Sequence, residues 1–486
     1  MIKINKTELR DKILACWIGK NIGGTLGGPY EGKREVFDIQ GFTTEPGNPL
    51  PNDDLDLQMV WLKAMEENGP FKLNEKILAE YWMEYIPPYW NEYGIGKGNM
   101  SIGLVPPVCG EYQNDYKHSN GAWIRTEVWA TLFPGLVDEA IKFAYYDACI
   151  DHGQGEGTYA TIFVAAMESA AFLISDLREL ITIGLSKIPE DSRMAKHVRA
   201  ACEAYDSGKT WREAREIVTN MSLEDPELGW FQAPANVSYA IIGLLYGEGD
   251  FKKSLIIATN CGDDTDCSCA TAGALLGLMH GQKIIPDDWR AYIGDKIVSI
   301  AINLGACYDL PRTCTEMADR IIAQHYILSA YRRIQWPYDQ TKHVAYVDGP
   351  SEISEEEKAY FSGMDFVNEL SSHSPYGFTM DFVLSKVWID YDRAPDITPG
   401  GEIKVKVTLK SKFLSKRHYQ YNFILPEGWQ ISGEKKNIGV TERDRMVSTE
   451  YTITAGEKVD FKNKVVLEIT CDGRSEIAYV PMVFLG

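Results

Sequence analysis

Apolar residues recur at helical spacing through the first two-thirds of the chain, and at every second position near its end. Residues 158–177 are rich in Ala and carry apolar side chains on most faces, which predicts a largely buried helix. Further apolar helices are predicted over 236–247, 252–259 and 269–281, each with Gly or Asn punctuation nearby. Because the loops between these stretches are short and the chain has no fixed repeat period, we expect a compact helical bundle.

The first predicted helix begins near the N-terminus. Asn5 is expected to cap it, and Glu8 is expected to complete a capping box. The helical pattern continues through residues 13–18. We expect the helix to stop at the glycines at positions 23, 24, 27 and 28.

The period of the pattern changes to two after about residue 376. Over 403–410, Ile, Val and Leu alternate with Lys and Thr, which predicts a half-buried strand. Residues 447–456 and 463–473 continue the alternation, and turns are predicted at 399–400 and 426–428. Several short strands over roughly 100 residues are typical of an antiparallel β-sandwich of immunoglobulin-like type.

Two domains of different class are therefore predicted. We expect a large all-α domain over 1–340 and a small antiparallel β-sandwich over 376–486. Residues 343–363 mix turn signals with a short acidic helix, so we interpret 341–375 as a linker or bridging segment.

The composition is that of a folded chain with an excess of acid. Asp and Glu number 69 against 49 Lys and Arg, which gives a formal net charge of -20 at pH 7. Such a charge repels phosphate backbones and anionic lipid, so neither nucleic acid nor a membrane is expected as a partner. A small phosphorylated ligand is not excluded, because it responds to the local site rather than to the net charge.

The N-terminal sequence and the cysteines favour a cytoplasmic protein. Charged residues interrupt the first 20 positions, which lack the apolar core of a signal peptide, and the chain has no apolar stretch of about 18 residues that could cross a membrane. The ten cysteines form no CxxC pair and lie mostly in apolar helical context, as Cys16 and Cys149 do. We interpret them as reduced thiols.

Two acidic clusters stand directly before predicted helices. They lie at 52–56 and 262–268 and contain Asp53, Asp54, Asp56, Asp263, Asp264 and Asp266. One interpretation is helix capping, since Asp is favoured at N-caps and in first turns. One carboxylate per cap suffices, however, and adjacent like charges repel unless a cation neutralises them. Oxygen donors without a majority of His or thiolate favour Mg²⁺, Mn²⁺ or Ca²⁺ over zinc.

Five features in the same order resemble the ADP-ribosylglycohydrolase superfamily, which includes the dinitrogenase reductase-activating glycohydrolases. They are the glycine-rich loop 23–31 that ends in Glu31, the acidic motif 52–54, the loop 119–125 that ends in Arg125, the histidine loop 151–156, and the motif 264–267 with the Ala/Gly-rich stretch 270–274 behind it. These features cover most of the predicted α domain. The β-sandwich lies outside the family pattern.

The resemblance implies an all-α fold with two Mg²⁺ or Mn²⁺ ions as cofactors. By position it implies the metal ligands Asn52, Asp53, Asp54, Asp264, Asp266 and Cys267. The family cleaves a bond at the anomeric carbon of an ADP-ribose ribose. Such cleavage needs a carboxylate as acid or base and further carboxylates to stabilise an oxocarbenium-like state. The expected catalytic residues are Glu31, on a mobile loop above the metals, with Asp54 and Asp264.

Gly121, Ala122, Arg125 and His152 are the expected substrate-binding residues. The backbone N–H groups of Gly121 and Ala122 could face a phosphate or a sugar, because glycine permits close approach. His152 could bind a sugar hydroxyl, or it could be a loop histidine satisfied by its neighbours.

Four positions depart from the family pattern. Asn52 replaces a usual Thr, Gly24 replaces a usual Asp, Leu55 replaces a frequent Thr, and Cys267 replaces Thr or Ser. A thiol is a poor ligand for Mg²⁺, so one of the two metal sites is expected to be weaker.

An aromatic run also lies outside the family pattern. It consists of Tyr81, Trp82, Tyr85, Tyr89, Trp90 and Tyr93. Such rings stack on sugars or adenine, or they form a packed helix face before the turn at 87–88.

Three functions are therefore open on the sequence alone. The first is a hydrolase acting on ADP-ribosylated protein or a related small ribosyl compound. The second is an enzyme of the same fold acting on another sugar, such as a furanoside or a glycan fragment. The appended sandwich favours this second function and makes carbohydrate a further partner class. The third is a non-catalytic ligand-binding homologue.

Overall fold

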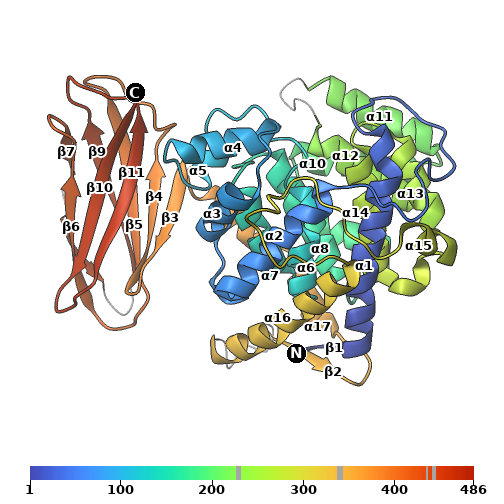
Figure 1. The fold of residues 1–486 in the computed structure, drawn as a ribbon. Helices are drawn as coiled ribbons and strands as arrows, with labels where there is room; N and C mark the ends of the chain where they lie inside the picture. The colour runs from blue at the N-terminus through green and yellow to red at the C-terminus, as the bar shows by residue number, and fades with distance from the viewer. Residues whose placement is uncertain (226–230, 336–342, 434–435, 441–444) are drawn as a thin grey trace. The chain divides into compact units, whose positions relative to one another are not determined.

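The computed structural model describes residues 1–225, 231–335, 343–433, 436–440 and 445–486 (Figure 1). The chain divides into two compact units. The first comprises Met1–Lys97 and Asn114–Asn368, and the second Gly98–Gln113 and Glu369–Gly486. The predicted fold class, a large helical domain followed by antiparallel β-sheets, is confirmed. The predicted boundary between 340 and 341 lies outside the described residues.

The helical part of the chain is built from short helices around two long ones. The helices are α1 (Lys6–Gly27), α2 (Asp53–Asn68), α3 (Glu75–Tyr85), α4 (Asn91–Ser101), α5 (Val108–Glu111), α6 (Glu127–Leu132), α7 (Val137–Ala148), α8 (Glu156–Ala170), α9 (Leu177–Ser186), α10 (Arg193–Asp206), α11 (Trp211–Leu223), α12 (Ala233–Gly247), α13 (Phe251–Asn260), α14 (Thr265–His280), α15 (Asp287–Ile293), α16 (Cys314–Gln335), α17 (Glu355–Lys358) and α18 (Asp365–Ser371). The three stretches predicted as apolar helices after residue 230 correspond to α12, α13 and α14, and α14 ends one residue before the predicted end.

The single helix predicted over 158–177 is wrong in its last third. α8 ends at Ala170, and the Lys12 ammonium donates hydrogen bonds to the carbonyls of Ala171 (3.1 Å) and Phe172 (2.9 Å) just past that end. Asp176 then caps a new helix, α9, because its carboxylate accepts a hydrogen bond from the Glu179 N–H (2.9 Å). A buried lysine from α1 therefore satisfies the carbonyls where the predicted helix is interrupted.

The N-cap of α1 is Asn5, as predicted, but Glu8 does not close a capping box. The Asn5 side chain accepts hydrogen bonds from the N–H groups of Thr7 and Glu8, both at 2.9 Å. The Asn5 N–H donates instead to the Ser351 hydroxyl (3.0 Å), which in turn donates to the Glu8 carboxylate (2.6 Å). A hydroxyl from far along the chain thus stands between the two groups that the capping box would join directly.

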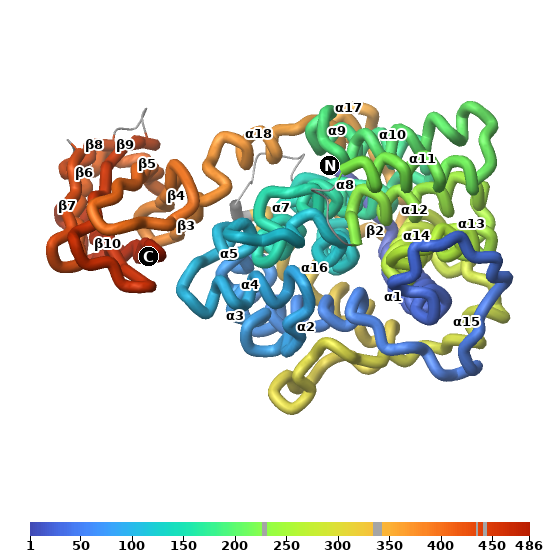
Figure 2. Tube along the Cα trace, turned by 90° about the horizontal axis from the view of Figure 1, so that it is seen from above, coloured from blue at the N-terminus to red at the C-terminus, as the bar shows by residue number. Residues whose placement is uncertain are grey.

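α1 ends at Gly27 with Gly28 as its C-cap, as the glycines predicted, but Gly23 and Gly24 lie within the helix. Gly23 and Gly27 let it pack closely on α14. A Cβ atom at Gly23 would lie 2.4 Å from the Cys269 carbonyl oxygen, and one at Gly27 would lie 2.2 Å from the Thr265 oxygen. From the opposite side, a Cβ at Gly273 would meet the Gly19 oxygen at 2.3 Å. Figures 1 and 2 show the two helices side by side. Their backbones are therefore in direct contact, which only glycine allows at these positions.

Part of the predicted linker completes the helical unit. Strand β2 (Val344–Val347) pairs in parallel with β1 (Ile2–Asn5), with Ile2 opposite Val344. The Tyr346 ring stacks on His325 of α16, with the ring centroids 5.2 Å apart. The segment after α16 therefore returns to the N-terminus of the chain rather than bridging two domains as an open linker.

The second unit is a pair of antiparallel sheets. Its strands are β3 (Gly377–Asp381), β4 (Ser385–Tyr391), β5 (Glu402–Ser411), β6 (Arg417–Ile424), β7 (Gln430–Ser432), β8 (Asn437–Val440), β9 (Met446–Thr454), β10 (Lys462–Cys471) and β11 (Ile477–Leu485). One sheet has the order β11-β10-β6-β8 and the other β3-β4-β5-β9-β7. The predicted alternation over 403–410 is confirmed, because the apolar positions of β5 are buried and its lysines are exposed.

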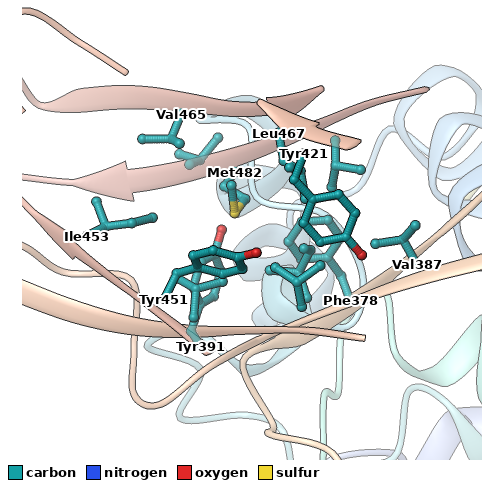
Figure 3. Close-up of a cluster of buried hydrophobic side chains, with 14 of the residues drawn as sticks. Phe378, Val387, Tyr391, Tyr421, Tyr451, Ile453, Val465, Leu467 and Met482 are labelled. Atoms are coloured by element: carbon teal, nitrogen blue, oxygen red, sulfur yellow. The ribbon is translucent and has the colours of Figure 1, made fainter. Parts of the chain in front are cut away.

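Side chains from both sheets form the core of this unit (Figure 3). Tyr391 of β4 meets Phe484 of β11 edge to face, with ring centroids 5.4 Å apart. Gly98–Gln113, which the sequence placed within the α domain, contributes Leu104, Val108 and Tyr112 to the same core. The alternation of the strands could not reveal this helical contribution, because it lies more than 250 residues earlier in the chain.

The contact between α1 and α14 should be sensitive to a single methyl group. We expect Gly23→Ala to lower the free energy of unfolding by about 2–3 kcal/mol in urea denaturation, because the added atom overpacks a backbone contact. Gly98→Ala in α4 is the matched control, since a Cβ there meets nothing within 4 Å. That control should be neutral or stabilising by up to about 1 kcal/mol. Equal destabilisation of both variants would contradict the packing explanation.

The buried imidazole of His325 should make the protein less stable in acid. Burial lowers the pKa of His325 to about 4, and its Nε2 lies 2.7 Å from the Thr131 carbonyl oxygen. The neutral ring contributes its full stability above about pH 6.5. That stability is lost as the pH falls towards 4, because the unfolded chain takes up the proton first. In the wild type, this effect lowers the free energy of unfolding by up to about 3 kcal/mol between pH 6.5 and pH 4, and we expect His325→Gln to abolish that decrease.

Urea denaturation at a series of pH values between 4 and 7 measures this effect. Tyr326→Gln on the exposed side of the same helix is the control and should keep the wild-type slope. A His325→Gln slope equal to that of the wild type would show that other groups carry the acid sensitivity.

Candidate metal centre

The first acidic cluster opens α2, and its carboxylates are not needed as a cap. Asn52 is the N-cap residue, and its side-chain oxygen accepts a hydrogen bond from the Asp54 N–H (2.7 Å). Asp53 accepts a hydrogen bond from the Tyr93 hydroxyl (3.0 Å), and Asp54 is fully buried. The capping interpretation therefore explains Asn52 but does not explain the two aspartates that follow it.

The second acidic cluster opens α14, and here too the carboxylates do not cap. Asp264 occupies the N-cap position, yet its side chain accepts no hydrogen bond from the first turn of the helix. It is held from outside, because the Asn120 amide donates to its Oδ2 atom (2.6 Å). Asp263 is turned to another set of partners, namely Arg34 (3.0 Å) and Asn236 (3.3 Å).

The two clusters meet in space, although about 200 residues separate them in the chain. Ligand atoms of Asp54, Asp266 and Cys267 lie within 4.8 Å of one another, and so do those of Glu31, Asp264 and Asp266. Asp266 belongs to both groups, so the two candidate cation positions are adjacent. This is the arrangement that a binuclear centre requires.

Buried oxygen atoms without partners show that these carboxylates fit cations. Within the described residues, Asp54 Oδ2, Asp264 Oδ1 and Asp266 Oδ1 are buried and accept no hydrogen bond. Burial and then the Asp266 charge raise the pKa of Asp53 to about 6, and burial raises the pKa of Asp264 well above its usual range. Crowded, desolvated carboxylates of this kind are stabilised by bound cations and destabilised without them.

Glu31 reaches the same place from the end of α1. The Asp266 charge, then burial and the Asp53 charge, raise its pKa to about 8. The loop that carries it is tied to the second cluster, since the Gly32 N–H donates to the Asp263 carbonyl (2.8 Å) and the Asp263 N–H donates to the Lys33 carbonyl (2.9 Å). Glu31 was predicted as a catalytic residue above the metals, and its oxygen is also close enough to be a ligand.

A buried ion pair lies behind the first cluster. The Lys20 ammonium is fully buried, 2.7 Å from Glu127 Oε1 and 3.8 Å from Asp54 Oδ2. Gln58 of α2 donates a hydrogen bond to the other Glu127 oxygen (2.8 Å). Lys20 thus places a fixed positive charge beside one of the candidate ligands, which partly offsets the repulsion in the cluster.

Cys267 is held as a neutral thiol. Its sulfur donates a hydrogen bond to Asp54 Oδ1 at 3.3 Å, and burial raises its pKa well above the usual range. That Cys267 is a metal ligand stays a prediction. In the described structure its thiol is a hydrogen-bond donor to the Asp54 carboxylate.

The carboxylates line a cavity of about 190 Å³ in the helical unit. Its lining residues are Glu31, Asp53, Trp90, Asn91, Glu92, Tyr93, Asn120, Gly121, Ile124, Phe231, Asp264, Asp266 and Cys267. Of the predicted substrate-binding residues, the structure brings only Gly121 to this cavity. Ala122, Arg125 and His152 do not line it, and neither does Asp54.

Arg125 and His152 lie behind the cavity wall in a buried network. The Arg125 guanidinium donates hydrogen bonds to Asp147 (2.7 Å) and Asp151 (2.8 Å), and His152 Nδ1 lies 2.8 Å from Asp151. Although burial alone would raise it, these two neighbours hold the pKa of Asp151 below its usual value. The Arg125 guanidinium also lies 5.8 Å from the centre of the Tyr93 ring. Their predicted contact with substrate stays a prediction, and their position suits support of the wall.

Two departures from the family pattern are neighbours in space. A Cβ atom at Gly24 would lie only 2.0 Å from Nδ2 of Asn52. The absence of a side chain at position 24 therefore makes room for the Asn52 amide that caps α2.

Several residues of the cavity were not predicted from the sequence. Asn120 lies inside the loop 119–125 of the family pattern, but its contact with Asp264 joins residues far apart in the chain and carries no local sequence signal. Each of the two interpretations of the aromatic run, a packed helix face or rings that stack on a ligand, fits part of it. Trp82 is fully buried in the core, whereas Trp90 and Tyr93 line the cavity. Glu92 and Phe231 carried no sequence signal of their own.

The helical unit and its shared carboxylate groups define a helical domain with a candidate metal centre. The chain belongs to the ADP-ribosylglycohydrolase family, whose family model matches residues 5–324. The matched range contains every residue of the candidate centre and ends before β3, the first strand of the antiparallel sheets.

Individual relatives are distant. ADP-ribosylhydrolase ARH3 of Homo sapiens is 21% identical over 330 residues, covering 57% of this chain and 87% of that protein. ADP-ribosylhydrolase ARH3 of Bos taurus is 20% identical, with 57% and 86% covered. A solved ADP-ribosylglycohydrolase-related protein complex is similar with 19% identity and a TM-score of 0.45, covering 66% of this chain and 99% of that one.

Within the described residues, none of the helices combines the length and the apolar character needed to span a bilayer.

Replacement of the shared aspartate should abolish cation binding at both positions. We expect Asp266→Asn to weaken Mn²⁺ binding by more than about 100-fold in isothermal titration, which exceeds the loss expected for a residue outside the ligand set. Without metal, the same variant should be more stable than the wild type in urea denaturation, because a charge that raises the pKa values of Glu31 and Asp53 is removed.

Asp263→Asn is the matched control, since Asp263 lies in the same loop but faces Arg34 and Asn236. It should leave Mn²⁺ affinity within a few-fold of the wild type. Equal loss of affinity in both variants would indicate a disturbed loop rather than a lost ligand.

Proposed function

We propose that this protein is a metal-dependent hydrolase that cleaves a glycosidic or N-glycosidic bond at an anomeric carbon. Its family points first to ADP-ribose or a related ribosyl compound as the substrate. The observation that carries the proposal is the meeting of carboxylates from three separate segments, with unpartnered buried oxygens, at one cavity.

Two Mg²⁺ or Mn²⁺ ions fit the residues present. Glu31, Asp264 and Asp266 would hold one ion, and Asp54, Asp266 and Cys267 the other. Asp53 and Asn52 complete the oxygen-rich surroundings. When bound, such ions orient sugar hydroxyls and make water more acidic.

The side chains of the chain itself supply the acid–base chemistry. Glu31 is exposed at the cavity, so its carboxylate can take a proton from water or give one to the leaving group. Bound cations would lower its pKa from the raised value and favour the base form. The carboxylates of Asp53, Asp264 and Asp266 present negative charge to an anomeric carbon that becomes positive as the bond breaks.

A second candidate substrate class is another sugar without a phosphate. It is favoured by the cavity itself, which within the described residues has no cationic side chain in its lining. A non-catalytic ligand-binding role is less well supported, because every predicted aspartate ligand is present and lies at or next to the cavity.

Activity should depend on divalent cations and on Asp264. The full chain is stripped with a chelator, restored with Mn²⁺ or Mg²⁺, and assayed against ADP-ribosylated arginine and serine peptides and aryl furanosides and pyranosides. We expect turnover of at least one compound only with metal, and a loss of about 1,000-fold or more in Asp264→Ala, the order of effect of losing one catalytic electrostatic group.

Asp263→Asn should retain the activity in this assay, as it should retain the metal. Failure to turn over any compound, with Mn²⁺ binding demonstrated by titration, would overturn the proposed hydrolase.

A further inference from the structure

The charged side chains among the described residues that line the cavity are all carboxylates. Its titratable lining consists of the carboxylates of Glu31, Asp53, Glu92, Asp264 and Asp266 together with Tyr93 and Cys267, and no lysine or arginine is found among the described lining residues. Two divalent cations would bring four positive charges against these five carboxylates. The loaded cavity therefore has no surplus positive charge for a phosphate group.

The two cationic side chains that follow Glu31 in the sequence, Lys33 and Arg34, have partners outside the cavity lining. The Lys33 ammonium donates a hydrogen bond to the Pro29 carbonyl (3.2 Å), and Arg34 pairs with Asp263 (3.0 Å). Neither side chain lines the cavity. Phosphate recognition in proteins normally relies on such groups or on free backbone N–H donors.

One of the two backbone donors predicted to face a phosphate or a sugar, the Gly121 N–H, is already engaged. The Gly121 N–H donates to Glu92 Oε1 (3.1 Å). A Cβ at Gly121 would lie 2.2 Å from the same oxygen, so only glycine at this position leaves room for the Glu92 carboxylate. A phosphate at this place would have to displace a buried negative charge.

Glu92 offers the opposite chemistry, a hydrogen-bond acceptor. The residue is 6% exposed, and within the described structure its second oxygen, Oε2, is itself buried and lacks a well-formed hydrogen bond, with the Ser119 hydroxyl beside the carboxylate. The glutamate lines a cavity whose walls also include the rings of Trp90, Tyr93 and Phe231. Carboxylates that accept from hydroxyls, beside aromatic rings that cover C–H faces, recognise sugars.

The volume agrees with a small ligand. Cavities for ligands of drug size hold about 300–1,000 Å³, and this one holds about 190 Å³. This volume has room for one sugar ring beside the carboxylates.

Building on the proposed function, we infer that the sugar held in this cavity carries no phosphate, and that Glu92 Oε2 accepts a hydrogen bond from one of its hydroxyls. The substrate class is then an uncharged glycoside. In its hydrolysis the bond between C1 and the leaving oxygen or nitrogen breaks, water supplies the oxygen of the new C1 hydroxyl, and the leaving group takes up a proton. Glu92 is a substrate-binding residue in this scheme, distinct from the metal ligands.

Matched ligands test the inference on the full, Mn²⁺-loaded chain. Isothermal titration compares ribose with ribose 5-phosphate, glucose with glucose 6-phosphate, and both with ADP-ribose. Methyl arabinofuranoside and methyl galactopyranoside extend the uncharged set. We expect at least one uncharged sugar to bind, and its phosphorylated partner or ADP-ribose to bind at least about tenfold more weakly.

The variant Glu92→Gln gives a result of opposite sign for the two substrate classes. If Glu92 accepts from a sugar hydroxyl, loss of its charge weakens binding of the uncharged sugar by about tenfold or more. If the cavity instead takes a phosphate, the same change removes repulsion and tightens binding of ADP-ribose. Glu75→Gln, at a buried glutamate of α3 outside the cavity, is the control and should change neither affinity. Circular dichroism confirms that the variants are folded.

Tight binding of ADP-ribose with none of the uncharged sugars bound, or no sugar bound at all, would overturn the inference. The proposed hydrolase would survive the first of these outcomes, since it requires only metal-dependent cleavage at an anomeric carbon. A chain that takes up no Mn²⁺ in the same titrations would instead overturn the proposed function.

Discussion

The backbone contact between α1 and α14 is the constraint on which the candidate centre depends. Glycines at 19, 23, 27 and 273 bring the two helices closer than side chains would allow. The contact continues to the end of α1, where Gly27 lies against Thr265 and Asp266 at the start of α14. Glu31 and the second acidic cluster therefore leave the same helix pair at the same place. A small separation of the helices would move ligands from both groups at once.

Electrostatic repulsion disfavours the clustering of the carboxylates in the candidate centre, and the packing of α1 on α14 holds them together. Several carboxylates are buried within a few ångströms, and their raised pKa values express the free energy of holding like charges together. Lys20, Asn120 and Tyr93 each stabilise one of these groups, but none of them neutralises the cluster. Cations that bind only the folded chain would add their binding free energy to its stability, so metal and fold are linked.

The sequence was sufficient for the parts of the structure that depend on local pattern. The alternation in β5 and the Asn5 cap were predicted because side-chain period and capping chemistry act over a few residues. The end of α8 was not, because it depends on Lys12 of another helix. Gly98–Gln113 was assigned to the α domain, since nothing local shows that Leu104 and Val108 pack in the β core.

In the candidate centre too, the residues that follow a local pattern were predicted and those that only the tertiary fold brings together were missed. The aspartates were found from their crowding and from the family resemblance, which concern residues adjacent in the sequence. Glu92 and Phe231 were missed because only the tertiary fold brings them to the cavity. Arg125 and His152 belong to the family pattern, but that pattern does not distinguish residues that touch a ligand from those that hold the wall in place.

The close approach of Gly24 to Asn52 also links position 24 to the start of α2. A side chain at 24 would meet the Asn52 amide nitrogen, so the amide would have to turn away to make room for it. The oxygen of the same amide accepts the hydrogen bond that caps α2, and this helix opens with Asp53 and Asp54. A single methyl group at 24 would therefore act on two candidate ligands without touching either of them, through the first turn of the helix that carries them.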